Sequence, residues 1–159
     1  MAVLAAGGLT VAVSEHDSPP EATEERLRQH LRVNLALLGV PFRYGQQAAN
    51  VEALRAGLMG SSFEDQLARL AGCVELSLPV EPGESESTSS NSGAAYLRRK
   101  QQAYRTVEDI KRKLASQVRD FREQRGRLTC LVEYSKVNAF RAALAPLTAS
   151  GPWPPSSFL

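Results

Sequence analysis

The chain has 159 residues, of which 43% are hydrophobic and 6% aromatic, and its formal net charge is +2. This length allows one domain with tails, or a small helical unit joined to a coiled coil. The low aromatic content disfavours the core of a β-sandwich or barrel. Two cysteines, Cys73 and Cys130, are too few for a disulfide framework or for a zinc site on their own. We therefore expect an all-α protein in a reducing compartment.

Residues 1–19 predict a flexible N-terminal tail. Residues 1–13 are small and apolar, and the first basic residue of the chain is Arg26. A secretory signal normally starts with a positively charged region, and a bilayer-spanning helix needs about 20 apolar residues. We expect neither in this chain, so the protein is placed in the cytoplasm, the nucleus or both, and is not secreted.

Residues 20–80 predict a small unit of short helices. A capping box at residues 18–21 precedes apolar residues at helical spacing, which are Leu27, Leu31, Leu35 and Leu38. Gly39 and Pro41 end this first helix, which covers about residues 20–38. Two further helices are expected at residues 46–58 and from residue 61 to about residue 71. Residues 74–80 alternate between apolar and other residues, which fits either a short strand or an extended strap.

Residues 81–93 are acidic and Ser-rich and carry no large apolar side chain. Such a segment cannot bury enough surface to offset the entropy of ordering it. We expect a flexible linker, in which serines beside glutamates are candidates for phosphorylation.

Residues 94–144 predict one long basic coiled-coil helix. The segment contains no proline, and a heptad frame places apolar residues at nine of 13 core positions. The residues expected to form the helix–helix interface are Tyr104, Val107, Leu114, Val118, Phe121, Leu128 and Val132. Gly126 interrupts the frame, and we expect a bend there, with a helical hairpin as the alternative.

The charge of this segment is unlike that of the rest of the chain. It holds 13 basic and 5 acidic residues, a net charge of +8, whereas the remainder carries a net charge of −6. The expected basic patch consists of Arg98, Arg99, Lys100, Lys111, Arg112 and Lys113. Lys111 and Arg125 fall at core positions, which favours a hetero-oligomeric bundle with acidic partner helices over a homodimer.

Residues 145–159 contain four of the nine prolines of the chain and predict a disordered Pro-rich tail. Trp153 lies between prolines, and residues 157–159 match a short carboxylate motif, so both are candidate recognition segments. The tail could also be an alternative end of a longer coiled coil.

No catalytic constellation is recognised in the sequence. His16 and His30 are the only histidines, metal-ligand spacing is missing, and the glycine pairs lack the lysine of a phosphate-binding loop. We expect no enzyme activity, no cofactor and no metal.

The predicted function is that of a coiled-coil scaffold or adaptor in a cytoskeletal, centrosomal, kinetochore or trafficking assembly. The alternative is a nucleic-acid-binding or nuclear regulatory protein that uses the basic helix, or one attracted to another acidic polymer. The sequence leaves partner identity, stoichiometry and helix orientation open.

Overall fold

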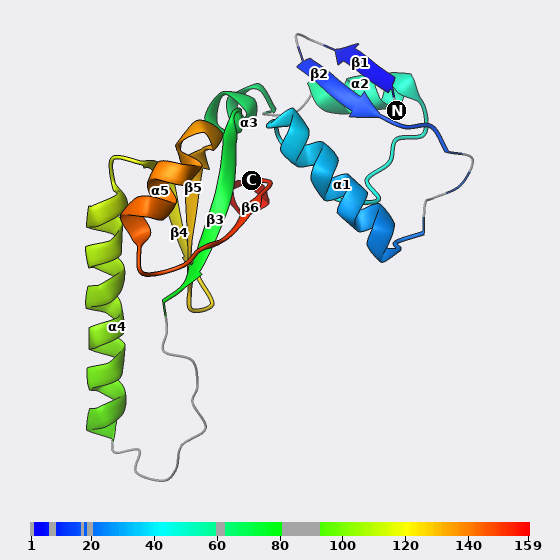
Figure 1. Cartoon of the computed structure of the whole chain (residues 1–159). Helices are drawn as coiled ribbons and strands as arrows, with labels where there is room; N and C mark the ends of the chain where they lie inside the picture. The colour runs from blue at the N-terminus through cyan, green and yellow to red at the C-terminus, as the bar shows by residue number, and fades with distance from the viewer. Residues whose placement is uncertain (1, 7–8, 17, 19–20, 60–62, 81–92) are drawn as a thin grey trace. The chain divides into compact units, whose positions relative to one another are not determined.

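The structure is a computed structural model that describes residues 2–6, 9–16, 18, 21–59, 63–80 and 93–159. These residues form six strands, five α-helices and two 3-10 turns, so the protein is mixed α/β and our all-α expectation is wrong. The chain divides into two compact units, one that runs up to Ala71 and one from Gly72 to Phe158 (Figure 1). We had grouped residues 20–80 together, but the strand at residues 73–79 belongs to the second unit.

The first unit begins with an antiparallel hairpin, where we had expected a flexible tail. β1 (Ala2–Ala6) pairs with β2 (Leu9–Val13), and Ala2 lies opposite Val13. Two apolar, valine-containing runs on either side of a Gly-Gly pair are typical of a hairpin. β1 also contacts α2 (Val51–Met59), so the hairpin is part of the packed unit.

The three short helices of this unit are confirmed, with shifted starts: α1 (Glu24–Leu37), α2, and α3 (Phe63–Leu70). The cap of α1 is Thr23 rather than Ser18, since Thr23 Oγ1 accepts a hydrogen bond from the Arg26 N–H at 3.3 Å. The helix ends at Leu37, one residue before the expected end, because Leu38 and not Gly39 adopts the left-handed conformation, with φ of 48°.

The loop after α1 is held against the helix by aromatic contacts. His30 Nε2 donates a hydrogen bond to the Phe42 carbonyl at 2.9 Å, and its ring meets Tyr44 edge-on with centroids 5.5 Å apart. Phe42 in turn packs on Phe63 with centroids 5.3 Å apart. His30 is therefore a structural residue at the edge of the small core of this unit.

The second unit is a four-stranded antiparallel sheet with two helices. Its strands are β3 (Cys73–Pro79), β4 (Val118–Gln124), β5 (Arg127–Glu133) and β6 (Ser150–Trp153), in the order β4-β5-β3-β6. α4 (Gly93–Leu114) follows β3, and α5 (Val137–Leu144) follows β5 after a 3-10 turn at Tyr134–Lys136. This β-α-β-β-α-β order with two split crossovers is the ferredoxin-like arrangement.

One face of the sheet carries the main core. Leu76 lies opposite Cys130 in the β3–β5 register, and alternation places Val74, Leu78, Leu128 and Val132 on the same face. The helices cover this face with buried side chains, which are Val107, Ile110 and Leu114 from α4 and Val137, Phe140 and Leu144 from α5.

The expected long helix at residues 94–144 is wrong. The segment contains α4, β4, β5 and α5 in succession (Figure 1). Arg125 and Gly126 both have positive φ, of 49° and 70°, which is the geometry of a two-residue β-hairpin turn. Gly126 therefore marks the reversal between two strands, because a glycine adopts this backbone region at no steric cost.

The expected disorder of the Pro-rich tail is also wrong. β6 pairs with β3, and a 3-10 turn at Ser156–Phe158 follows it. The Ser157 N–H donates to Glu75 Oε2 at 3.0 Å, and Arg122 donates to the Ser157 carbonyl. Phe158 is only 1% exposed and lies under the Arg122 guanidinium, 5.6 Å from the ring centroid. The C-terminal segment thus covers the second face of the sheet, the face that carries Glu75 and Arg122.

Proline is compatible with this arrangement because β6 is an edge strand, and edge strands tolerate proline. Gly151 allows β6 to approach β3 closely: its φ is 112°, and a Cβ at this position would lie 2.7 Å from the Glu75 carbonyl oxygen. Arg141 on α5 donates to the Gly151 carbonyl at 2.7 Å and fixes the strand from the other side.

Two further expectations concern the acidic linker and membrane-spanning segments. The predicted acidic linker at residues 81–93 falls at residues 81–92 outside the described residues, and Gly93 is already the first residue of α4. In the described part of the chain, no helix combines the length and apolar character that crossing a membrane requires.

Candidate functional site

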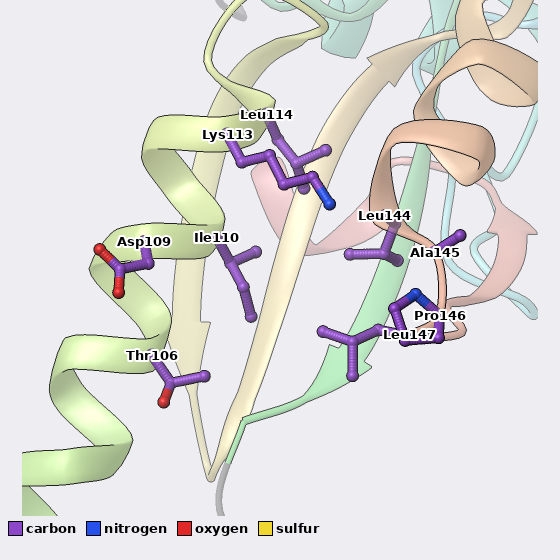
Figure 2. A pocket seen from close by; sticks show the side chains of 9 residues that line it. All are labelled: Thr106, Asp109, Ile110, Lys113, Leu114, Leu144, Ala145, Pro146 and Leu147. Carbon is purple, nitrogen blue, oxygen red and sulfur yellow. The ribbon is translucent and has the colours of Figure 1, made fainter.

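The candidate site is an apolar groove in the second unit, between α4 and the end of α5. Its volume is about 230 Å³. Its apolar lining comes from Ile110 and Leu114 on α4 and from Leu144, Ala145, Pro146 and Leu147 on the other side. Ile110 and Leu114 point toward Leu144 and Leu147 across the groove (Figure 2). Thr106, Asp109 and Lys113 on α4 complete the lining.

Local sequence explains why these residues meet. Thr106, Asp109, Ile110 and Lys113 are spaced by three and four residues, so they form one stripe along α4. On the other side, Pro146 cannot continue α5, and the chain turns so that the Leu147 N–H bonds to the Leu144 carbonyl at 3.1 Å. The turn leaves Leu147 49% exposed at the rim of the groove.

Ion pairs determine which cations of α4 are engaged within the unit. Lys111 contacts Glu108 at 3.0 Å on its own helix and Glu123 at 3.4 Å on β4. The hydrogen bond to Glu108, assisted by Glu123, raises the pKa of Lys111. Lys111 is therefore a charged residue that ties α4 to the sheet. Lys113, by contrast, is exposed on the groove side of α4.

A second, shallow hollow adjoins the groove along α4. It is lined by Gln101, Gln102 and Arg105 together with Thr106 and Asp109, which it shares with the groove. Asp109 is paired with the Arg112 guanidinium at 3.1 Å. The two hollows follow residues 101–114, and at 1.5 Å per residue this is a path of about 20 Å.

The residues expected to form a helix–helix seam lie on three different elements. Val107 and Leu114 are buried on α4, Val118 and Phe121 are half-buried on β4, and Leu128 and Val132 are buried on β5. They contribute to the core of the second unit and not to a coiled coil. Tyr104 belongs to α4, but its side chain lies outside the described residues.

The predicted basic patch is brought onto one helix, since all six of its residues belong to α4. The side chains of Arg98, Arg99 and Lys100 lie outside the described residues. Of the other three, Lys111 and Arg112 form ion pairs with Glu108, Glu123 and Asp109.

Sequence reasoning missed half of the groove. Leu144 was placed at the end of a long helix, and Ala145, Pro146 and Leu147 were assigned to a disordered tail. The available signal was Pro146, which stops α5 and directs the apolar Leu147 back toward the preceding turn.

Histidine and cysteine side chains, which often serve in catalysis, are hydrogen-bonded or buried in this structure. His16 is exposed and hydrogen-bonds Ser14 Oγ at 2.9 Å. Cys130 lies on the helix-covered face of the sheet and Cys73 on the opposite face, and both thiols are free. Burial raises the pKa of Cys130 to about 12 and also raises that of Cys73. Among the described residues, no group of three or more His, Cys, Asp and Glu side chains is placed to hold a metal ion.

Comparison with protein families matches residues 1–159 to the family described as gas vesicle synthesis protein GvpL/GvpF. Comparison with curated proteins and with solved structures gave no match. The family match overturns our expected scaffold of a cytoskeletal, centrosomal, kinetochore or trafficking assembly, and equally the nucleic-acid-binding alternative. Because the match spans the whole sequence, the chain belongs to the GvpL/GvpF family of gas vesicle synthesis proteins.

Proposed function

We propose that this protein acts in gas vesicle synthesis as a non-enzymatic assembly protein that holds a partner protein at the apolar groove. A gas vesicle assembly protein interacts with protein partners, and it needs a surface that binds them. The observation that carries the proposal is the groove, an apolar hollow that ends at the half-exposed Leu147.

The size of the groove favours a protein partner. Its volume of about 230 Å³ is below the roughly 300–1,000 Å³ of small-molecule pockets. A hollow of this size accepts one or two apolar side chains of a larger partner. Each Leu or Phe side chain that becomes fully buried contributes about 1.5–3 kcal/mol before the cost of association.

The chemistry of the lining also favours binding over catalysis. Apart from apolar residues, the described lining consists of Thr106, Asp109 and Lys113. A hydroxyl nucleophile needs an adjacent base, and the Asp109 carboxylate is engaged by Arg112 at 3.1 Å. These groups suit the polar rim of a docking site, where they fix the orientation of a partner.

We further infer that the protein works in a reducing compartment. Its two cysteines are free and buried on opposite faces of one sheet, so they behave as small apolar core residues.

The proposed function is tested by complementation in a gas-vesicle-producing host from which this gene has been deleted. The wild-type chain, Leu147→Asp and Tyr134→Asp are expressed, and vesicles are counted by electron microscopy. Leu147 and Tyr134 are similarly exposed, at 49% and 53%, but Tyr134 does not line the groove. Leu147→Asp is expected to abolish vesicle formation because it places a charge at the apolar rim. Tyr134→Asp should restore it.

Equal rescue by both variants would contradict the role of the groove. Normal vesicle formation in the deleted host itself would contradict a role for this protein in assembly. Folding of both variants is checked by circular dichroism of the purified chains.

A further inference from the structure

The N-terminal part of α4, residues 93–106 and here called its first half, runs past the end of the sheet that the remainder, its second half, covers (Figure 1). Among the side chains of α4 that the structure describes, the buried ones are Val107, Ile110 and Leu114, all in its second half. In the first half, the side chains that the structure describes are exposed, and they are Leu97, Gln101, Gln102, Arg105 and Thr106. This half of the helix therefore extends beyond the core of its own unit.

Charge is distributed unequally along α4. Residues 93–106 contain four basic residues and no acidic one. In the second half, Lys111 and Arg112 are matched by Glu108 and Asp109. We call residues 93–106 the basic half of α4. By sequence it carries a net charge of +4, and the exposed Arg105 and Lys113 line the two hollows.

A projecting helix of this kind gains from a partner in two ways. A helix of about 14 residues without packing is marginal in water. The helix dipole also favours acidic groups at a helix N-terminus, and the first turn of α4 contains no acidic residue. An anionic segment alongside would offset both effects.

We infer that the groove and the basic half of α4 form one continuous docking site for an acidic segment of a partner protein. Apolar side chains of that segment enter the groove between Ile110 and Leu147, and its carboxylates lie over the hollow lined by Gln102 and Arg105. The inference rests on the proposed function and deepens it by stating the chemistry of the partner. Charge complementarity to Arg105 and Lys113, which line the two hollows, selects the occupant.

Two other occupants fit less well. Residues 81–92 of this chain are acidic, but they contain no large apolar residue and cannot fill the groove. A nucleic acid would match the basic half, yet it has no apolar side chain to place against Leu144 and Leu147.

The test is site-specific photocrosslinking in the gas-vesicle-producing host, with the full chain carrying benzoylphenylalanine at one position. The probe is placed at Gln102 in the shallow hollow, at Leu147 at the groove rim, and at Tyr134 as the control. Crosslinked peptides are identified by mass spectrometry. We expect probes at Gln102 and Leu147 to react with one segment of the same partner, rich in Asp and Glu and containing large apolar residues.

The charge requirement is tested in the same experiment. Arg105→Glu combined with Lys113→Glu should lower the crosslink yield at Gln102 roughly tenfold, since opposite charges across an interface become like charges. Arg43→Glu, a reversal at an exposed arginine of the first unit, is the matched control and should leave the yield unchanged.

Several outcomes would overturn the inference. The first kind is a crosslink to the wrong target: a basic or uncharged segment, a second copy of this chain, residues 81–92 or nucleic acid. The second is a crosslink yield that does not change with the double charge reversal. The proposed function fails separately, if the deleted host forms vesicles normally. If the host needs the protein for vesicle formation but probes at Gln102 and Leu147 give no crosslink, the proposed assembly function stands and this docking site is rejected.

Discussion

Replacing Phe158 with alanine tests whether the C-terminal segment belongs to the core of the second unit. The phenyl ring is 1% exposed on the sheet face opposite the helices, and Arg122 lies over it at 5.6 Å. Phe→Ala at a buried site costs about 3–5 kcal/mol. We expect about 3 kcal/mol, because a segment at the edge of the sheet can close partly over the cavity. Loss of the cation–π contact, about 0.5–1 kcal/mol, is included in this figure.

The assay is urea unfolding of the purified chain, followed by circular dichroism. With a slope of about 1–3 kcal/mol per molar urea, the midpoint of the second unit should fall by roughly 1–3 M. Leu159→Ala is the control: Leu159 is 43% exposed, so its replacement should change stability by less than about 0.5 kcal/mol. If Phe158→Ala were as mild as Leu159→Ala, the segment would be a tail without a packing role, and the reasoning would be wrong.

Three further predictions concern individual groups. Gly151→Ala should destabilise the protein by about 2 kcal/mol or more, since the φ of Gly151 is 112° and the new Cβ would lie 2.7 Å from the Glu75 carbonyl oxygen. Gly57→Ala is the control, because Gly57 lies in α2 with open space around it, and this change should stabilise the protein by up to about 1 kcal/mol. Both changes are measured by thermal unfolding. Cys130 should react with iodoacetamide at pH 8 only after urea unfolding, because burial raises its pKa to about 12; reaction in the folded state would contradict its burial. Hydrogen bonds from Lys136 and Arg119 lower the pKa of Glu133, so the contribution of Glu133 to stability is present at neutral pH and is lost as pH falls through that lowered pKa. In pH-dependent unfolding, Glu133→Gln should be less stable than wild type at pH 7 and equal to it at about pH 2, where both side chains are neutral. A stability difference that stays constant with pH would refute the pairing.

The short helices of the first unit could be predicted from sequence, and β3 was one of two alternatives for residues 74–80, whereas β4, β5 and β6 were not predicted. A spacing of four residues, as between Leu128 and Val132, places two side chains on one face of a helix and equally on one face of a strand. The heptad frame alternates steps of three and four residues, and the steps of four between apolar residues, such as this one and Leu114 to Val118, do not distinguish the two structures. Cys130, midway between them, distinguishes the two structures: it shares their buried face in β5 but would leave it in a helix.

The turn between β4 and β5 was the second missed signal. Gly126 was recognised as an interruption, but a glycine in a helix costs only about 1 kcal/mol, so the heptad pattern outweighed it. The structure resolves the conflict through the positive φ of both Arg125 and Gly126. The candidate groove was beyond reach for the same reason, because it needs α4 and the end of α5 side by side, whereas a continuous helix would hold them far apart.

The pairing of β3 with β5 has a consequence for how the protein is made. These central strands are joined across a long stretch of chain: Ser77 contacts Thr129, 52 residues later. While the ribosome is still producing α4 and β4, the newly emerged β3 has no neighbouring strand, and Val74, Leu76 and Leu78 are exposed to water. An unpaired apolar strand is a site of aggregation, and non-local pairing slows folding. We therefore expect the second unit to be the part of the chain most exposed to aggregation during translation.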